Sequence, residues 1–67
     1  MKIKVFGADW CSDCVTAKRF LDSKGVEFEY IDITDNQQAI DLVERINNGR
    51  RVIPTLIVDG VSFTNPG

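Results

Sequence analysis

The sequence predicts an α/β domain built around a mixed four-stranded sheet. Apolar strand patterns alternate with two helical patterns, and a strong hairpin signal follows the second helix. The order strand, helix, strand, helix, hairpin implies one right-handed parallel crossover and one antiparallel pair. A chain of 67 residues that is 43% hydrophobic and 27% charged is ordinary for one folded unit, so we expect a single domain spanning residues 1–67.

The first half of the chain contains one strand–helix–strand unit. Residues 2–6 alternate polar and apolar side chains before Gly7, which predicts the first strand. Residues 12–24 contain no proline and carry apolar side chains at helical spacing, so they predict a helix that stops at Gly25. The alternation of residues 26–33 predicts the second strand. The apolar stripe of the helix is formed by Cys14, Ala17 and Leu21, with Val15 and Phe20 beside it.

The second helix is expected to begin in a capping box. Two alternatives have the required spacing of three residues, Thr34 with Gln37 and Asp35 with Gln38. The apolar residues that follow recur at i, i+3, i+4 and i+7 and define one buried stripe, formed by Ala39, Leu42, Val43 and Ile46. Asn48-Gly49 should end this helix.

The last part of the chain predicts a β-hairpin. Residues 52–58 are mostly β-branched and apolar, and Asp59-Gly60 before residues 61–64 is a favoured two-residue turn. Asn65-Pro66-Gly67 has the composition of a helix start. We therefore expect a third helix to be missing and part of one sheet face to be uncovered.

Both cysteines of the chain, Cys11 and Cys14, lie three positions apart where the first strand passes into the first helix. Two thiols at this spacing in a first helical turn can close a small disulfide ring with little loop-closure cost. Unpaired N–H groups and the positive end of the helix dipole stabilise a thiolate at Cys11. Cys14, one turn further in, should be the more shielded partner. The pattern favours redox chemistry with Cys11 and Cys14 as the catalytic residues.

Two other interpretations of the cysteine pair stay open. A Cys-x-x-Cys pair is half of a zinc site, and a buried cysteine is often only a small hydrophobic side chain. The sequence has two cysteines and no histidine, so a metal would need carboxylates or cysteines from a second chain. We predict no metal site within one chain, and the metal alternative is a dimer bridged by zinc or an iron–sulfur cluster.

Composition and charge narrow the choice of partners. With a net charge of −2, the chain lacks the basic face that nucleic acid requires. The sequence contains no apolar run long enough to predict a membrane span and no leader pattern that would predict secretion. One disulfide across so short a loop stabilises a fold weakly, so the pair is more natural as a transient bond in a reducing compartment. We expect a cytoplasmic protein that binds neither nucleic acid nor membranes.

The order of elements and two motifs resemble the thioredoxin superfamily, and more closely its glutaredoxin branch. The two motifs are Trp10-Cys11-Ser12-Asp13-Cys14 and Val52-Ile53-Pro54-Thr55. Two further segments, Asn47 to Thr55 and Asp59-Gly60 with Thr64-Asn65-Pro66, resemble mycoredoxin-like and ribonucleotide-reductase-donating redoxins. The resemblance implies a thioredoxin-like fold of the order β-α-β-α-β-β, here without the C-terminal helix.

The same resemblance implies a substrate-binding surface. Pro54 should follow a cis peptide bond and face the reactive cysteine, while the backbone of Ile53 pairs with an extended substrate. An ordinary trans proline at a strand start is the alternative for Pro54. Trp10 either forms an apolar rim where partners dock or packs partly buried. Arg50 and Arg51 either hold the carboxylate of a thiol cofactor or an acidic partner, or they are solvated loop cations.

Two departures from the family's pattern argue against glutathione as the thiol cofactor. Many glutathione-using glutaredoxins have a lysine three positions before the first cysteine, where this chain has Ala8 followed by Asp9. The Gly-Gly pair that helps to hold glutathione in such proteins is replaced here by Thr64-Asn65.

We therefore predict a monomeric thiol-disulfide oxidoreductase without a bound cofactor. Cys11 attacks a disulfide in a protein or in a mixed disulfide of a low-molecular-weight thiol, and Cys14 resolves the intermediate. The expected reductant is a low-molecular-weight thiol or thioredoxin reductase. The alternative function is an electron donor dedicated to one reductase, such as ribonucleotide reductase.

Overall fold

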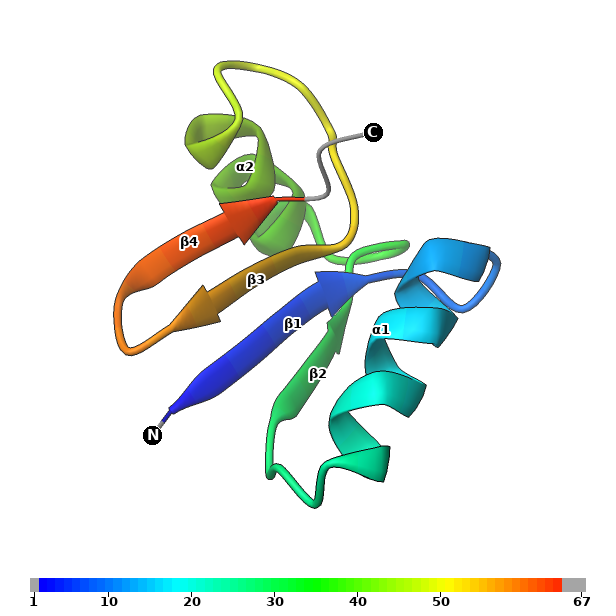
Figure 1. The fold of residues 1–67 in the computed structure, drawn as a ribbon. Coiled ribbons are helices and arrows are strands. Elements are labelled where there is room, and N and C mark those ends of the chain that lie inside the picture. Colours follow the sequence, from blue (N-terminus) through cyan, green and yellow to red (C-terminus); the bar gives the residue numbers. More distant parts are fainter. Residues whose placement is uncertain (1, 65–67) are drawn as a thin grey trace.

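The computed structural model describes residues 2–64 and contains one mixed four-stranded sheet between two helices (Figure 1). The elements are β1 (Ile3–Gly7), α1 (Ser12–Ser23), β2 (Glu29–Asp32), α2 (Gln37–Ile46), β3 (Thr55–Val58) and β4 (Val61–Thr64). The strand order is β2-β1-β3-β4, with β1 parallel to β2 and the other two pairs antiparallel. The predicted mixed sheet and hairpin are confirmed. Neither helix in this part of the chain is long and apolar enough to cross a membrane.

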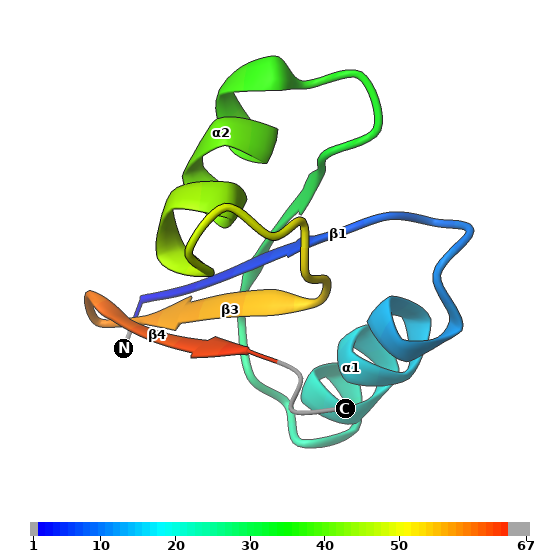
Figure 2. The ribbon, with the colours of Figure 1, turned by 90° about the horizontal axis from the view of Figure 1, so that it is seen from above.

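The two helices cover opposite faces of the sheet, as Figure 2 shows. On one face, α2 packs against the main apolar cluster, which includes Phe6 of β1 and Val43 of α2. On the other face, Val5 of β1 is fully buried, and Cys14 is the buried residue of α1. Phe20, predicted to lie beside the apolar stripe of this helix, is 59% exposed. The buried anchor of α1 on the sheet is therefore one of the two cysteines.

Two strands start later than predicted, each because of a local hydrogen bond. The second strand begins at Glu29, and the N–H of Val26 still donates to the carbonyl of Leu21 in α1 at 3.1 Å, so the chain is tied to the helix where the strand was expected to start. The third strand begins at Thr55, whose hydroxyl donates to the carbonyl of Val52 at 2.7 Å and curls the chain before it can pair. Both bonds hold the backbone in a turn, so strand pairing begins at a later residue than predicted.

The second helix has a different N-cap from the one predicted. Asn36 is the N-cap of α2, and its Oδ1 accepts the N–H of Ala39 at 3.1 Å. The capping boxes predicted to start at Thr34 and at Asp35 are wrong. The N–H of Thr34 donates to Oδ1 of Asp32 at 2.8 Å, so this residue belongs to the turn that follows β2.

The predicted turn residues adopt left-handed backbone angles. Asn48 and Gly49 follow α2 with φ of 58° and 91°, so the helix ends at the expected Asn-Gly pair. In the hairpin, Asp59 and Gly60 have φ of 50° and 86°, and two positive angles in succession are the requirement of a type I′ turn. The register between β3 and β4 follows from this turn.

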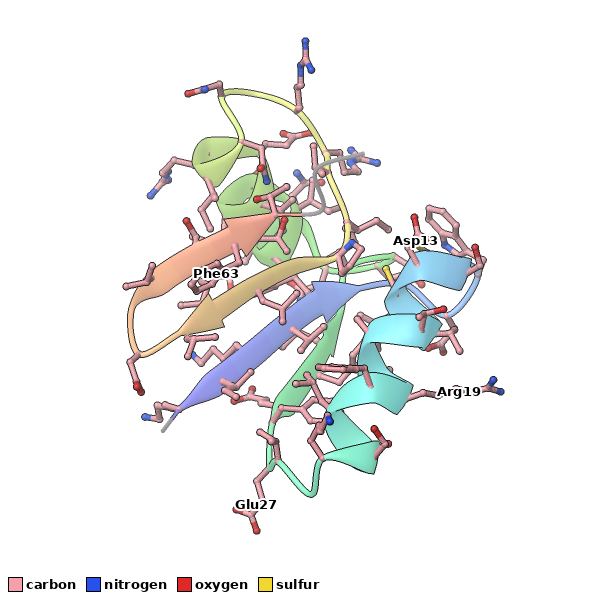
Figure 3. All side chains as sticks on the ribbon, viewed as in Figure 1. Asp13, Arg19, Glu27 and Phe63 are labelled. Carbon is pink, nitrogen blue, oxygen red and sulfur yellow. The ribbon has the colours of Figure 1, made fainter. Side chains whose placement is uncertain are left out.

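The sheet face that α1 covers is open over β4. Val61 and Phe63 lie opposite Val58 and Leu56 of β3, and opposite residues share a face. Val61 is 58% exposed and Phe63, labelled in Figure 3, is 55% exposed. An uncovered part of one face agrees with the prediction, whereas the helix start predicted at residues 65–67 lies outside the described residues.

Candidate active site

Cys11 forms the N-cap of α1, directly after the loop that leaves β1. Its backbone is extended (φ −93°, ψ 114°), and its Sγ accepts the N–H of Cys14 at 3.4 Å. The N–H of Cys11 donates to the carbonyl of Ala8 at 3.1 Å, which closes the loop before the helix. A sulfur held against the N–H groups at the positive end of a helix is stabilised as an anion. Because Cys11 is also partly exposed, it is suited to be a nucleophile.

Cys14 is the buried partner of the pair and lies in the first turn of α1, directly after Asp13, which Figure 3 labels. Its exposed fraction is 0%, and it packs against Gly7 of β1. Burial, followed by the hydrogen bond to Cys11, raises the pKa of the Cys14 thiol to about 12. Both cysteines are free thiols, so the structure shows the reduced pair. As predicted, Cys14 is the more shielded of the two, and it keeps its proton at neutral pH.

The cis-proline segment lies at the same end of the sheet as the cysteine pair. The Ile53–Pro54 peptide bond is cis, as the resemblance implies, and Pro54 is buried. Thr55 pairs with Phe6, so the residues before Thr55 lie beside the end of β1 that leads to Cys11 (Figure 1). Ile53 is half-buried against the apolar cluster under α2. The structure thus brings together residues that are some forty positions apart in the sequence.

A side-chain network that the sequence analysis missed holds this segment in place. Asn47 donates from Nδ2 to the carbonyl of Val43 at 2.8 Å and to the Thr55 hydroxyl at 3.2 Å. Its Oδ1 accepts the hydroxyl of Thr64 at 2.8 Å. Thr55 is itself fully buried. The network ties the end of α2 to the start of β3 and the end of β4, and its sequence signal is a polar threonine inside an apolar strand pattern.

Trp10 stands at a negatively charged rim. Its side chain is 73% exposed, which excludes the packing role considered for it. A hollow of about 440 Å³ next to Trp10 is lined by Asp9, Asp32, Thr34, Asp35 and Asn36. Hydrogen bonds from the side chain and backbone of Thr34 keep the pKa of Asp32 below its ordinary value, so this carboxylate is charged at neutral pH. The surface beside Cys11 therefore combines one large apolar ring with carboxylates.

Arg50 and Arg51 are both exposed but have different surroundings. Arg50 lines a second hollow, of about 500 Å³, together with Val52. Arg51 lies with its Nε 3.6 Å from Oε2 of Glu44 in α2, an exposed ion pair that contributes little to stability. Arg50 is thus the cation beside the segment that leads to the cis-proline, and Arg51 is directed to α2.

Metal ligands are not gathered within the described part of the chain. In residues 2–64, no group of three or more His, Cys, Asp or Glu side chains is arranged to hold a metal ion. A metal-bridged dimer would need ligands from two chains, with Cys11 and Cys14 as the contribution of one of them.

The sequence matches a known family over most of its length. The family model described as Glutaredoxin matches residues 3–63. Mycoredoxin 1 of Corynebacterium glutamicum is 34% identical over 65 residues, which are 96% of this chain and 80% of that protein.

Solved structures with the same fold agree with this match. The glutaredoxin-like protein NrdH-redoxin from Escherichia coli, described as having a thioredoxin-like activity profile, has a TM-score of 0.82 and 25% identity. The similarity covers 97% of this chain and 83% of that one. The thioredoxin-like protein BC3987 also has a TM-score of 0.82 and 25% identity, over 94% of this chain and 85% of that one. The predicted thioredoxin-like fold is confirmed.

Proposed function

The chain belongs to the glutaredoxin family, whose members are thiol-disulfide oxidoreductases, and from this premise we propose that Cys11 and Cys14 form its redox centre. The Cys11 thiolate attacks a disulfide R–S–S–R′, forms the mixed disulfide Cys11–S–S–R, and releases R′ as a thiolate that takes up a proton. Cys14 then loses its proton and attacks the Cys11 sulfur, so that the Cys11–Cys14 bond forms and R leaves as a thiol. The substrate gains the two electrons that the pair loses, and a separate reductant restores the dithiol.

The different environments of the two sulfurs are the observation that carries this proposal. Cys11 is partly exposed at the start of α1, and its sulfur accepts the N–H of Cys14 at 3.4 Å, so it is the sulfur that a disulfide substrate can reach first. Cys14 is fully buried, and its raised pKa of about 12 keeps it protonated in the reduced pair. Cys11 is thus suited to react with a substrate, and Cys14 is suited to resolve the mixed disulfide that results.

The substrate is proposed to bind along the cis-proline segment. Among residues 2–64, no backbone hydrogen bond outside the helices and strands uses Ile53, so its N–H and carbonyl keep their capacity to pair with an extended chain. Pro54 follows Ile53 at the end of the sheet where β1 leads to Cys11. Trp10 supplies an exposed apolar contact and Arg50 a nearby positive charge. Arg51 is paired with Glu44, so it adds charge only at the outer edge.

The charges around the site support a reductant other than glutathione. Ala8, where many glutathione-using relatives have a lysine, is fully buried and offers no charge. Asp9, Asp32 and Asp35 line the hollow beside Trp10 and repel a ligand that carries carboxylates. We therefore assign the reduction of the Cys11–Cys14 disulfide to thioredoxin reductase or to a low-molecular-weight thiol with less negative charge than glutathione.

A dedicated electron donor for one reductase is the second candidate. Its support is the likeness to NrdH-redoxin, a glutaredoxin-like protein described by a thioredoxin-like activity profile. In this case one large partner, such as ribonucleotide reductase, docks at the Trp10 rim and exchanges disulfides rapidly. Small mixed disulfides would then be poor substrates.

A coupled reduction assay separates the two candidates. Thioredoxin reductase, glutathione, coenzyme A and mycothiol are compared as donors, with a protein disulfide and a small mixed disulfide as substrates. A general reductase turns over both substrates, loses all activity in Cys11→Ser, and keeps activity on the small mixed disulfide in Cys14→Ser. A dedicated donor couples to thioredoxin reductase but reduces the small mixed disulfide poorly. Absence of turnover by the wild-type protein with every donor refutes both.

A further inference from the structure

Tyr30 of β2 places a buried hydroxyl group next to the redox pair. The residue pairs with Val5 in the β1–β2 register, so its ring lies on the face of the sheet that α1 covers. The hydroxyl oxygen is buried and has no hydrogen-bond partner among residues 2–64. A polar group buried without a partner disfavours folding, and such groups in native proteins often serve a function.

The Tyr30 hydroxyl and the Cys14 sulfur both lie close to the position that a Cβ atom on Gly7 would occupy. A methyl group built on Gly7 would lie 2.7 Å from Cys14 Sγ and 3.2 Å from Tyr30 Oη. Both atoms therefore border the space that glycine leaves open by having no side chain. In the reduced pair the Cys14 sulfur carries its proton and is a weak acceptor, whereas a thiolate there would be a strong one.

The surroundings of Tyr30 keep its phenol in the protonated form. Burial raises the pKa of Tyr30 to about 12. The thiols and carboxylates that act on it raise the pKa further, in the order Cys14, Asp9, Asp32 and Cys11. Lys18 of α1 lies with its Nζ 4.1 Å from the ring centroid, where a cation stabilises the position of the ring. Tyr30 is therefore available as a hydrogen-bond donor at neutral pH.

We propose that Tyr30 is a positioning residue for resolution of the mixed disulfide, whose hydroxyl donates a hydrogen bond to the Cys14 sulfur as that sulfur becomes an anion. This role rests on the proposed function of Cys11 and Cys14. Cys14 gives its proton to water and attacks the Cys11 sulfur, the bond between Cys11 and the substrate sulfur breaks, and the released thiolate takes a proton from solvent. Tyr30 keeps its own proton throughout. Its hydrogen bond offsets part of the desolvation that disfavours the Cys14 anion.

Tyr30→Phe removes the hydroxyl and keeps the ring, so it tests this role directly. The protein is mixed with dithiobis(nitrobenzoate), which releases one coloured thiolate when Cys11 attacks and a second when Cys14 resolves. We expect the second release to be about tenfold slower in Tyr30→Phe, the size of effect that loss of one hydrogen bond to a charged group produces. Its rise with pH should move to higher pH, while the first release stays at the wild-type rate.

A second variant changes the strength of the same donor. The chain has one tyrosine, so global incorporation of 3-fluorotyrosine alters Tyr30 alone. The fluorinated phenol is a stronger donor and should make the second release faster than in the wild type. Thr16→Val is the matched control, because it removes a hydroxyl that donates to the carbonyl of Ser12 in α1 at 2.9 Å. It should leave both releases unchanged.

The outcomes separate the role of Tyr30 from the proposed function. If the wild type, Tyr30→Phe and the fluorinated protein share one rate and one pH profile for the second release, Tyr30 has no positioning role. If the wild-type protein releases only the first thiolate, the proposed function of the pair fails instead. If circular dichroism shows that Tyr30→Phe does not fold, the rate of the second release in the fluorinated protein decides whether Tyr30 has the proposed role.

Discussion

Gly7 of β1 packs directly against Cys14 of α1, and Gly7→Ala tests this contact. A Cβ atom there would lie 2.7 Å from Cys14 Sγ and 2.9 Å from Cys14 Cβ, both closer than such atoms pack in proteins. Rotation of the Cys14 side chain can move the sulfur but not the Cβ atom, which is attached to α1. The start of the helix therefore has to shift, and overpacking of this kind costs about 1–3 kcal/mol.

Urea unfolding and thermal melting of the reduced protein measure this loss. In a domain of this size, each 1 kcal/mol lowers the melting temperature by about 4–8 °C. The same shift displaces Cys14 relative to Cys11, so we expect slower resolution of the mixed disulfide while the first attack by Cys11 persists. Gly25→Ala is the control, because Gly25 has a φ of +68° but no atom within 4 Å of an added Cβ. It should lower the free energy of unfolding through backbone strain and leave both redox steps unchanged.

A double variant identifies the clash as the cause. Cys14→Gly removes both atoms that the added methyl group would meet, the Cβ and the sulfur, so Gly7→Ala should be less destabilising in a Cys14→Gly background than in the wild type. Unfolding free energies of Gly7→Ala within about 0.5 kcal/mol of wild type, the range of ordinary surface changes, would refute the packing argument. Equal losses with and without the Cys14 side chain would refute the assignment of the loss to that contact.

Three further predictions concern pH, the hydrogen-bond network and the helix cap. The ordinary pKa values are 9.0 for the Cys14 thiol and 10.0 for the Tyr30 phenol, and both rise to about 12 in the fold. The unfolded chain therefore loses these protons at lower pH than the folded protein does. The free energy of unfolding should be highest below pH 9 and should fall as the pH rises from 9 toward 12. Urea midpoints that stay constant over this window would contradict the burial of both groups. Asn47→Ala leaves the buried Thr55 hydroxyl without one of its partners and should lower the free energy of unfolding in urea by about 1–3 kcal/mol. Because Asn47 also holds the cis-proline segment, the KM for disulfide substrates should rise. Asn36→Ala should lower the free energy of unfolding by about 1 kcal/mol as a lost N-cap, and an unchanged melting temperature would argue against this cap.

Features that depend on neighbouring residues were predictable from the sequence. The Asp59-Gly60 turn follows from the backbone preferences of two adjacent residues, and the structure shows the two positive φ angles that such a turn needs. The cap of α2 shows where this reasoning ends. Several successive residues have capping chemistry, and Asn36 is the N-cap in a structure where the N–H of Thr34 is bonded to Asp32 in the preceding turn. A choice among chemically similar neighbours depends on hydrogen bonds that a pattern of residue types does not contain.

The order of the elements, the mixed sheet and the placement of a Cys-x-x-Cys pair at a helix start could all be predicted from the sequence, because spacing along the chain encodes them. Only the packed fold shows that the Tyr30 hydroxyl and the Cys14 sulfur both lie next to Gly7, and that Asn47 binds both Thr55 and Thr64. These residues come from different strands and helices. Their contacts arise from strand register and from the seating of each helix on the sheet, so they exist only once the apolar faces have packed together.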